Sequence, residues 1–189
     1  MSFVRRIAAT LAGMLALPAL AVAATIGGTF YATQYDFREF WAATDGKPFQ
    51  VVLAGEAFPG VDPAVVARDL LPAMQAAKPR PALTFTYDRP TPAPSPDYRM
   101  VLVFNAANNL NADPVCAGEP MRFKPGKPGV FHVYAIYCRN DRMLSYTTAW
   151  TDATGPTDPR IGQLFRQLFR VLFSEQQTRW SMNDQSNFR

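Results

Sequence analysis

Two acidic side chains near the start of the chain have a spacing that could support hydrolysis. Asp36 and Glu39 lie three residues apart in the aromatic segment Tyr-Asp-Phe-Arg-Glu-Phe-Trp, residues 35–41. On a helix, this spacing places both carboxylates on one face, beside rings that could raise a pKa, as a sugar-cleaving site requires. The structural interpretation is that Asp36 caps a short helix, Glu39 completes a capping box and the aromatic residues anchor the segment. We favour the structural interpretation.

Other catalytic signatures are absent from the sequence. His132 is the only histidine, and it lies in a strand-like segment, which favours a structural imidazole over a catalytic base. A single histidine also argues against a zinc or non-haem iron site. The chain has no Gly-x-Ser-x-Gly, no His-Glu-x-x-His, no phosphate loop and no Gly-x-Gly-x-x-Gly. We therefore predict no metal and no cofactor, and we favour a non-enzymatic domain.

The chain opens with the three parts of a secretory signal peptide. A short basic start is followed by an apolar run over residues 7–17 and by the small-x-small site Ala21-Val22-Ala23. The apolar run has roughly half the length that a membrane-spanning helix needs. We predict cleavage between Ala23 and Ala24 and release into the periplasm; the alternative is an uncleaved anchor. Met14 stands where a lipoprotein carries cysteine, so we expect no lipid anchor.

Cys116 and Cys138 are the only cysteines of the chain. In an exported protein, an even number of cysteines predicts a disulfide. The spacing does not give Cys-x-x-Cys, and two thiols with one distant histidine cannot complete a structural zinc site. The bridge is expected to stabilise the fold by roughly 3 kcal/mol. It would also anchor the long connection over residues 105–129, which is either functional or merely irregular.

Two segments have the pattern of amphipathic helices. Residues 62–77 and residues 158–172 each begin with an Asp-Pro pair, which suits a helix cap and first turn. The second has the wider apolar stripe: Ile161, Leu164, Phe165, Leu168, Phe169 and Leu172. Its arginines and phenylalanines would also suit an anionic membrane surface, but a stripe of this width favours packing on a sheet. A third Asp-Pro pair, at Asp113, is expected to open only a turn because Gly118 soon follows.

Five segments rich in β-branched and aromatic residues predict strands, at residues 49–53, 83–87, 98–104, 130–138 and 144–150. The element order is then β-α-β-β-β-β-α. Alternation in the second and last strands predicts an α+β fold, with a mainly antiparallel five-stranded sheet and both helices on one face. Only the crossover through the first helix needs to be parallel. The sheet residues expected beneath the helices are Leu83, Phe85, Tyr87, Leu144, Tyr146 and Trp150.

These elements divide the chain into a signal peptide (residues 1–23), a single α+β domain (residues 24–173) and a polar tail (residues 174–189) that could be mobile. The chain carries 19 basic and 15 acidic side chains, for a net charge of +4. Two of the basic residues belong to the signal peptide, so the mature charge is +2. A charge this small argues against nucleic-acid binding.

Nucleotide bases could stack on Tyr134 and Tyr137, but single-stranded nucleic acid also needs a basic patch, and none accompanies these residues. We expect no stable membrane anchor after processing. The expected partner is therefore an envelope protein or a small ligand.

Several segments resemble a known group of proteins. They are Gly-Glu-Ala-Phe at residues 55–58, the run over residues 98–105, the Cys116 loop and Tyr-Cys-Arg at residues 137–139. Together they resemble an uncharacterised family of exported proteins and lipoproteins of alphaproteobacteria. The resemblance covers most of the mature chain, but it consists of strand edges and implies no activity. The sequence thus favours a periplasmic binding or envelope-accessory domain; the alternative is a small hydrolase that uses Asp36 and Glu39.

Overall fold

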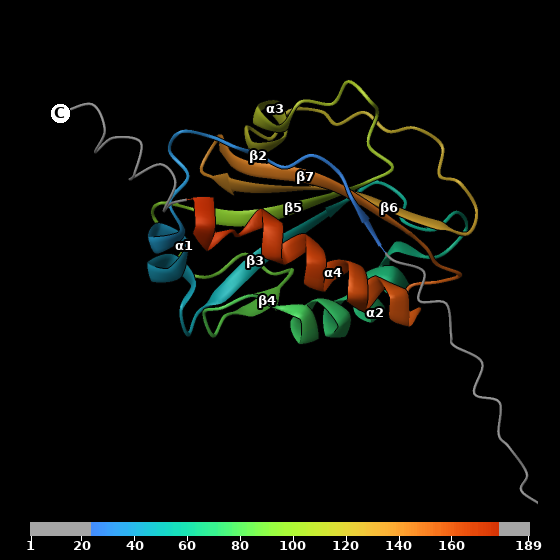
Figure 1. Cartoon of the computed structure of the whole chain (residues 1–189), viewed down its shortest axis with the longest axis horizontal. Helices are drawn as coiled ribbons and strands as arrows, with labels where there is room; N and C mark the ends of the chain where they lie inside the picture. The colour runs from blue at the N-terminus through green and yellow to red at the C-terminus, as the bar shows by residue number, and fades with distance from the viewer. Residues whose placement is uncertain (1–23, 178–189) are drawn as a thin grey trace, which may run out of the picture.

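The computed structural model describes residues 24–177 (Figure 1). The predicted signal peptide and residues 178–189 of the predicted tail lie outside the described residues. Within them the fold is α+β, as predicted. The strands are β1 (Thr25–Ile26), β2 (Phe30–Tyr31), β3 (Pro48–Ala54), β4 (Thr84–Thr86), β5 (Tyr98–Phe104), β6 (Val130–Arg139) and β7 (Arg142–Asp152). The helices are α1 (Phe37–Thr44), α2 (Pro63–Ala77), α3 (Ala112–Cys116) and α4 (Pro159–Leu172).

All the strands belong to one mixed sheet, in the order β1-β7-β6-β5-β3-β4, with β2 also paired to β7. The predicted sheet of five mainly antiparallel strands was therefore incomplete. β1 and β2 have two residues each, too few to show alternation in the sequence. Both neighbours of β3 run parallel to it, because residues 87–97 carry the chain back from the end of β4 to the start of β5. The remaining pairs are antiparallel.

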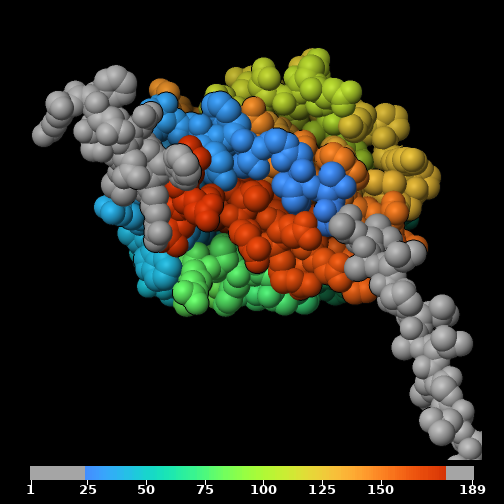
Figure 2. All heavy atoms as spheres, in the orientation of Figure 1, coloured from blue at the N-terminus to red at the C-terminus, as the bar shows by residue number. Residues whose placement is uncertain are grey.

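The main core lies between the sheet and the pair α2 and α4, as the amphipathic patterns predicted. Figure 2 shows α4 in red, beside the N-terminal segment in blue. Phe165 and Phe169 of α4 are fully buried, which supports core packing over lipid contact. Phe169 packs on Phe85 of β4 at a ring-centroid distance of 5.2 Å. α1 closes one end of this core, where Phe40 stacks on Phe173 at 4.4 Å.

Aspartates cap three of the helices. The side chains of Asp36, Asp62 and Asp158 each accept a hydrogen bond from the backbone N–H two residues later, at 2.8, 2.7 and 3.0 Å. This confirms the predicted starts of α2 and α4. The expectation of a mere turn at Asp113 was wrong, because α3 forms there. Gly118 has φ +80° and ends this short helix, since a left-handed glycine commonly follows a helix terminus.

α3 packs on the sheet face opposite α2 and α4, so the helices do not all lie on one face. A second, smaller core forms beneath α3. Its fully or nearly buried members include Val101, Val103, Val115, Ile136 and Cys138. The sheet is therefore covered on both faces at the α3 end, and this arrangement leaves the rest of the second face more open.

A β-bulge in β7 changes which residues face each side. Met143 pairs with Cys138 and Ser145 pairs with Tyr137, so Leu144 is an extra residue. Leu144 lies in the main core, and the Ser145 hydroxyl donates to the Leu172 carbonyl of α4 at 2.7 Å. Both residues thus face α4. From Tyr146 onward, successive side chains of β7 again alternate between the two faces of the sheet.

Because of the bulge, the predicted set of sheet residues beneath the helices was partly wrong. Leu83, Phe85, Tyr87 and Leu144 belong to or pack against the main core, as expected. Tyr146 packs instead against the second cluster, and Trp150 remains 39% exposed. Among residues 24–177, no helix combines the length and apolarity needed to cross a membrane.

Candidate ligand-binding groove

A groove of about 750 Å³ lies on the second face of the sheet, beside α3. We call it the aromatic groove. Its floor is formed by side chains of three neighbouring strands: Phe30 of β2, Tyr146 and Thr148 of β7, and His132 and Tyr134 of β6. Its wall comes from the 105–129 connection, both from α3 and from residues on either side of that helix, including Ala107, Asn108, Leu110 and Lys124. The volume falls within the range that is usual for small-ligand sites.

The pairing of neighbouring strands brings together the first group of rings in this floor. Phe30 pairs with Tyr146 across β2 and β7, and their rings stack with centroids 5.3 Å apart and planes 19° apart. Tyr146 also meets Tyr134 edge-on at 5.5 Å. Tyr134 is nearly buried beneath this group, whereas Phe30 is 47% exposed. The bulge at Leu144 is what directs Tyr146 to this face.

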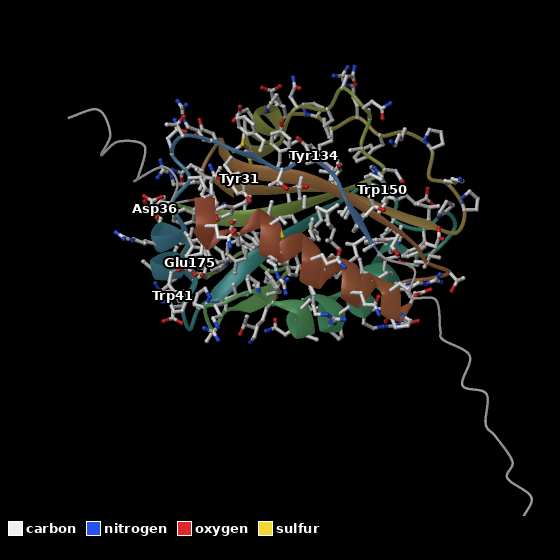
Figure 3. The ribbon with its side chains drawn as sticks, in the orientation of Figure 1. Tyr31, Asp36, Trp41, Tyr134, Trp150 and Glu175 are labelled. Atoms are coloured by element: carbon white, nitrogen blue, oxygen red, sulfur yellow. A yellow bond between two sulfur atoms is a disulfide. The ribbon has the colours of Figure 1, made fainter. Side chains whose placement is uncertain are left out.

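A second ring pair lies farther along β7. His132 and Trp150 occupy paired positions on β6 and β7, and their rings stack at 6.4 Å. In Figure 3, Tyr134 lies below α3 and Trp150 lies farther along the sheet. Burial, and secondarily the charge of Lys124, lowers the pKa of His132 below its ordinary value of 6.5. His132 Nδ1 is buried and has no partner among the described residues. The imidazole is therefore neutral at neutral pH.

The rim of the groove is polar and nearly neutral. Lys124 Nζ donates to Asn108 Oδ1 at 3.0 Å. Asp113 Oδ1 accepts from the Met143 backbone N–H at 3.1 Å. Asn111 begins α3, but its side chain makes no capping hydrogen bond. One cation, one carboxylate and two amides thus surround the aromatic floor, which suits a ligand with apolar faces and uncharged polar edges.

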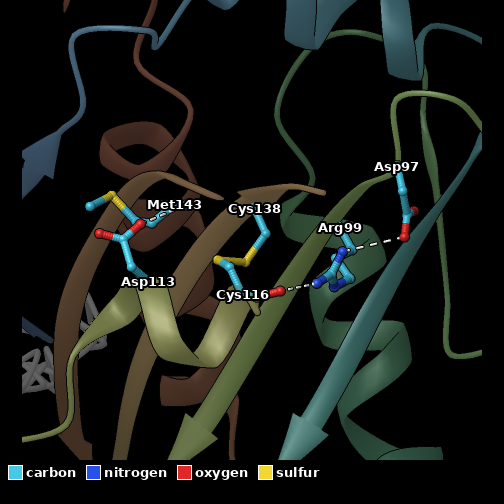
Figure 4. The surroundings of a disulfide bond; sticks show 6 residues. All are labelled: Asp97, Arg99, Asp113, Cys116, Cys138 and Met143. Carbon is cyan, nitrogen blue, oxygen red and sulfur yellow. Dashed lines mark hydrogen bonds and ion pairs between the residues drawn. A yellow bond between two sulfur atoms is a disulfide. The ribbon is translucent and has the colours of Figure 1, made fainter. Parts of the chain in front are cut away.

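Three contacts hold α3 against the sheet as the wall of the groove (Figure 4). The predicted disulfide is confirmed: Cys116 and Cys138 are bonded, with their Cα atoms 5.6 Å apart. Arg99 of β5 donates to the Cys116 carbonyl at the end of α3, and its other nitrogen lies 3.3 Å from Asp97 Oδ2. The third contact is the bond from Met143 to Asp113. The 105–129 connection is therefore tied to three strands.

The two predicted carboxylates do not share a pocket. Asp36 caps α1 (Figure 3). Glu39 does not complete a capping box; instead it accepts two hydrogen bonds from Arg139 Nη1, at 2.9 and 3.0 Å, and one from the Tyr98 hydroxyl at 3.3 Å. Glu39 lines a separate pocket of about 520 Å³, which α1 forms with the proline-rich residues 90–96. Asp36 does not line that pocket.

Sequence reasoning missed most of the groove. It considered Tyr134 and Tyr137 as one stacking surface, but residues three apart in a strand lie on opposite faces. Tyr137 is fully buried in the main core. Phe30 was missed because β2 is too short to have a pattern. The available signal was the position of Phe30 just after Gly27-Gly28, since glycine in or beside a strand often marks a close approach of another backbone.

No three His, Cys, Asp or Glu side chains of residues 24–177 are grouped so that they could hold a metal ion. In the comparisons with known proteins, no family model, no curated protein and no solved structure matches the chain. The groove and its chemistry are therefore the basis for any functional conclusion.

Proposed function

We propose that this chain is an exported, periplasmic binding protein that holds a small envelope ligand in the aromatic groove, and that it is not an enzyme. The observation that carries the proposal is the combination, in one groove of about 750 Å³, of a ring-lined floor and a polar rim. Stacked rings supply apolar contact area, and a few placed polar groups orient a ligand. The wall is also fixed in advance, which lowers the entropic cost of binding.

Export is supported by the predicted signal peptide and by the disulfide. A disulfide persists in oxidising compartments such as the periplasm and is rare in the cytosol. The disulfide also links directly to the proposed role, because it holds α3 against β6. A reduced chain would lose part of the wall rather than part of the main core.

The hydrolase alternative has less support from the geometry. Glu39 accepts hydrogen bonds from Arg139 and lines a pocket that Asp36 does not line. Asp36 is engaged with the first turn of α1. We therefore propose ligand binding rather than hydrolysis.

A thermal-shift experiment tests the proposed function. The mature protein is heated with size-fractionated small molecules from a bacterial envelope extract. A ligand at about 100 times its Kd stabilises the native state by roughly 2.7 kcal/mol. We expect at least one fraction to raise the Tm of the wild type and of Trp41→Ala, a control on α1 that is 41% exposed.

The same fraction should leave Phe30→Ala and Tyr146→Ala unshifted. Phe30 is 47% exposed, so its variant should fold even if Tyr146→Ala is destabilised. If no fraction shifts the wild type, or if Phe30→Ala responds as fully as the wild type, the aromatic groove is not the binding site.

A further inference from the structure

The two ring pairs of the second face form a row along β7. Tyr146, stacked with Phe30, and Trp150, stacked with His132, are four residues apart on the same face of the strand. At 3.3 Å per residue this separation is roughly 13 Å. Thr148 lies between them and lines the groove. A ligand that contacts both pairs must therefore be extended and must offer more than one flat apolar face.

Each pair leaves one large ring open to solvent. Phe30 is 47% exposed and Trp150 is 39% exposed. Aromatic rings have an electron-rich face, which attracts the weakly positive hydrogens of aliphatic C–H groups. A pyranose ring presents such C–H groups on its faces and hydroxyls at its edges. The exposed rings thus match the faces of linked sugars.

The rim supplies the partners that sugar hydroxyls need. A hydroxyl both donates and accepts, and the amides of Asn108 and Asn111 offer both kinds of group. Lys124 adds donors and Asp113 adds an acceptor. The two charges cancel, so the rim does not select a strongly anionic or cationic ligand.

Three other ligand classes fit less well. A peptide that adds a strand needs a long free edge, but the edge strands beside the groove, β1 and β2, have only two residues each. A nucleic acid needs several cations, and Lys124 is the only basic residue other than the neutral His132 that lines the groove. An alkyl chain favours a closed apolar cavity, whereas this groove has a polar rim.

We propose that the aromatic groove, together with the adjoining Trp150, binds a neutral oligosaccharide. One pyranose ring lies against Phe30 and Tyr146, and another lies against Trp150, which stacks on the lining residue His132 but does not itself line the groove. The proposal rests on the proposed function and names its ligand class. It requires at least two sugar rings in contact with the protein, because the two ring pairs are too far apart for one.

Isothermal titration calorimetry of the mature protein tests the ligand class. The probes are linear tetramers of β-linked glucose, β-linked N-acetylglucosamine and α-linked glucose, each compared with its own monosaccharide. At least one tetramer should bind, and should bind roughly 10-fold or more tightly than its monosaccharide. Phe30→Ala and Trp150→Ala should each weaken the tetramer by roughly 3- to 10-fold, the size of one aromatic contact. Trp41→Ala should stay within about twofold of the wild type.

Several results would overturn the proposal. If no tetramer binds but an envelope fraction still stabilises the wild type and not Phe30→Ala, the groove binds another class of ligand and the proposed function survives. If neither binds, both proposals fail. Tetramer binding that Phe30→Ala and Trp150→Ala leave unchanged would place the sugar elsewhere, and equal affinity for tetramer and monosaccharide would exclude a two-ring site.

Discussion

His132 and Trp150 face each other across β6 and β7, with their ring planes 23° apart. The half-buried His132 imidazole lines the groove, whereas the exposed Trp150 indole lies beside it and is not one of the lining residues. Because burial lowers the pKa of His132, the folded protein keeps the imidazole neutral at a pH where the unfolded chain binds a proton.

This difference predicts that acid weakens the fold. Below the unfolded pKa of about 6.5 the unfolded state binds more protons than the folded state, so the free energy of unfolding falls as the pH drops. Urea unfolding should therefore give a lower stability at about pH 5 than at about pH 7.5. His132→Gln should flatten this dependence, since the chain has no other histidine. An equal pH dependence in both proteins would show that His132 is not the responsible group.

The disulfide should stabilise the fold without being essential to it. Cys116→Ser should lower the free energy of unfolding by roughly 3 kcal/mol, because the bridge closes a loop of about twenty residues. The main core contains neither cysteine, so the variant should keep a single cooperative transition. Thiol labelling of the native, oxidised wild type should detect no free thiol. Labelling of two thiols would disprove the bridge.

Packing of α4 on the sheet predicts a large effect at Phe169. Its side chain is fully buried against Phe85 and Phe165. Phe169→Ala should therefore cost roughly 3–5 kcal/mol of stability. The neighbouring Arg170→Ala, at an exposed position of the same helix, is the control and should change stability by less than about 0.5 kcal/mol. A Phe169→Ala protein as stable as this control would favour a lipid-facing helix instead.

Processing is predicted between Ala23 and Ala24. Mass spectrometry of the protein recovered from a periplasmic fraction should find an amino terminus at or next to Ala24. Ala24 packs against the main core, and β1 begins at the next residue, so cleavage there would keep the strand that borders β7. A periplasmic protein that retains Met1 would contradict the prediction.

The main core could be predicted because its signals are local. The Asp-Pro pairs at Asp62 and Asp158 and the apolar stripes of the following segments were sufficient to locate α2 and α4. The disulfide followed from the cysteine count and the expected compartment. Each of these signals depends on residues within one element or on a single possible pairing.

The second face could not be predicted, because it depends on pairing between distant segments. The bulge at Leu144 inverts the facing of Tyr146 and Trp150, and alternation within β7 alone gives no sign of it. Phe30 reaches the groove only because β2 pairs with β7. The role of Glu39 was hidden for the same reason, since its partner Arg139 is 100 residues away.

The most direct test of the central claim is an NMR titration of the isotope-labelled mature protein with the stabilising envelope fraction. If the aromatic groove is the binding site, the largest shifts should fall on the lining residues Phe30, His132 and Tyr146 and on residues 108–113. An extended sugar should also shift the adjoining Trp150 indole. The Trp41 indole, which lies on α1 apart from Tyr134 and Trp150 (Figure 3), should not move. Shifts centred on Glu39 and the proline-rich residues 90–96, with the groove unperturbed, would contradict the account.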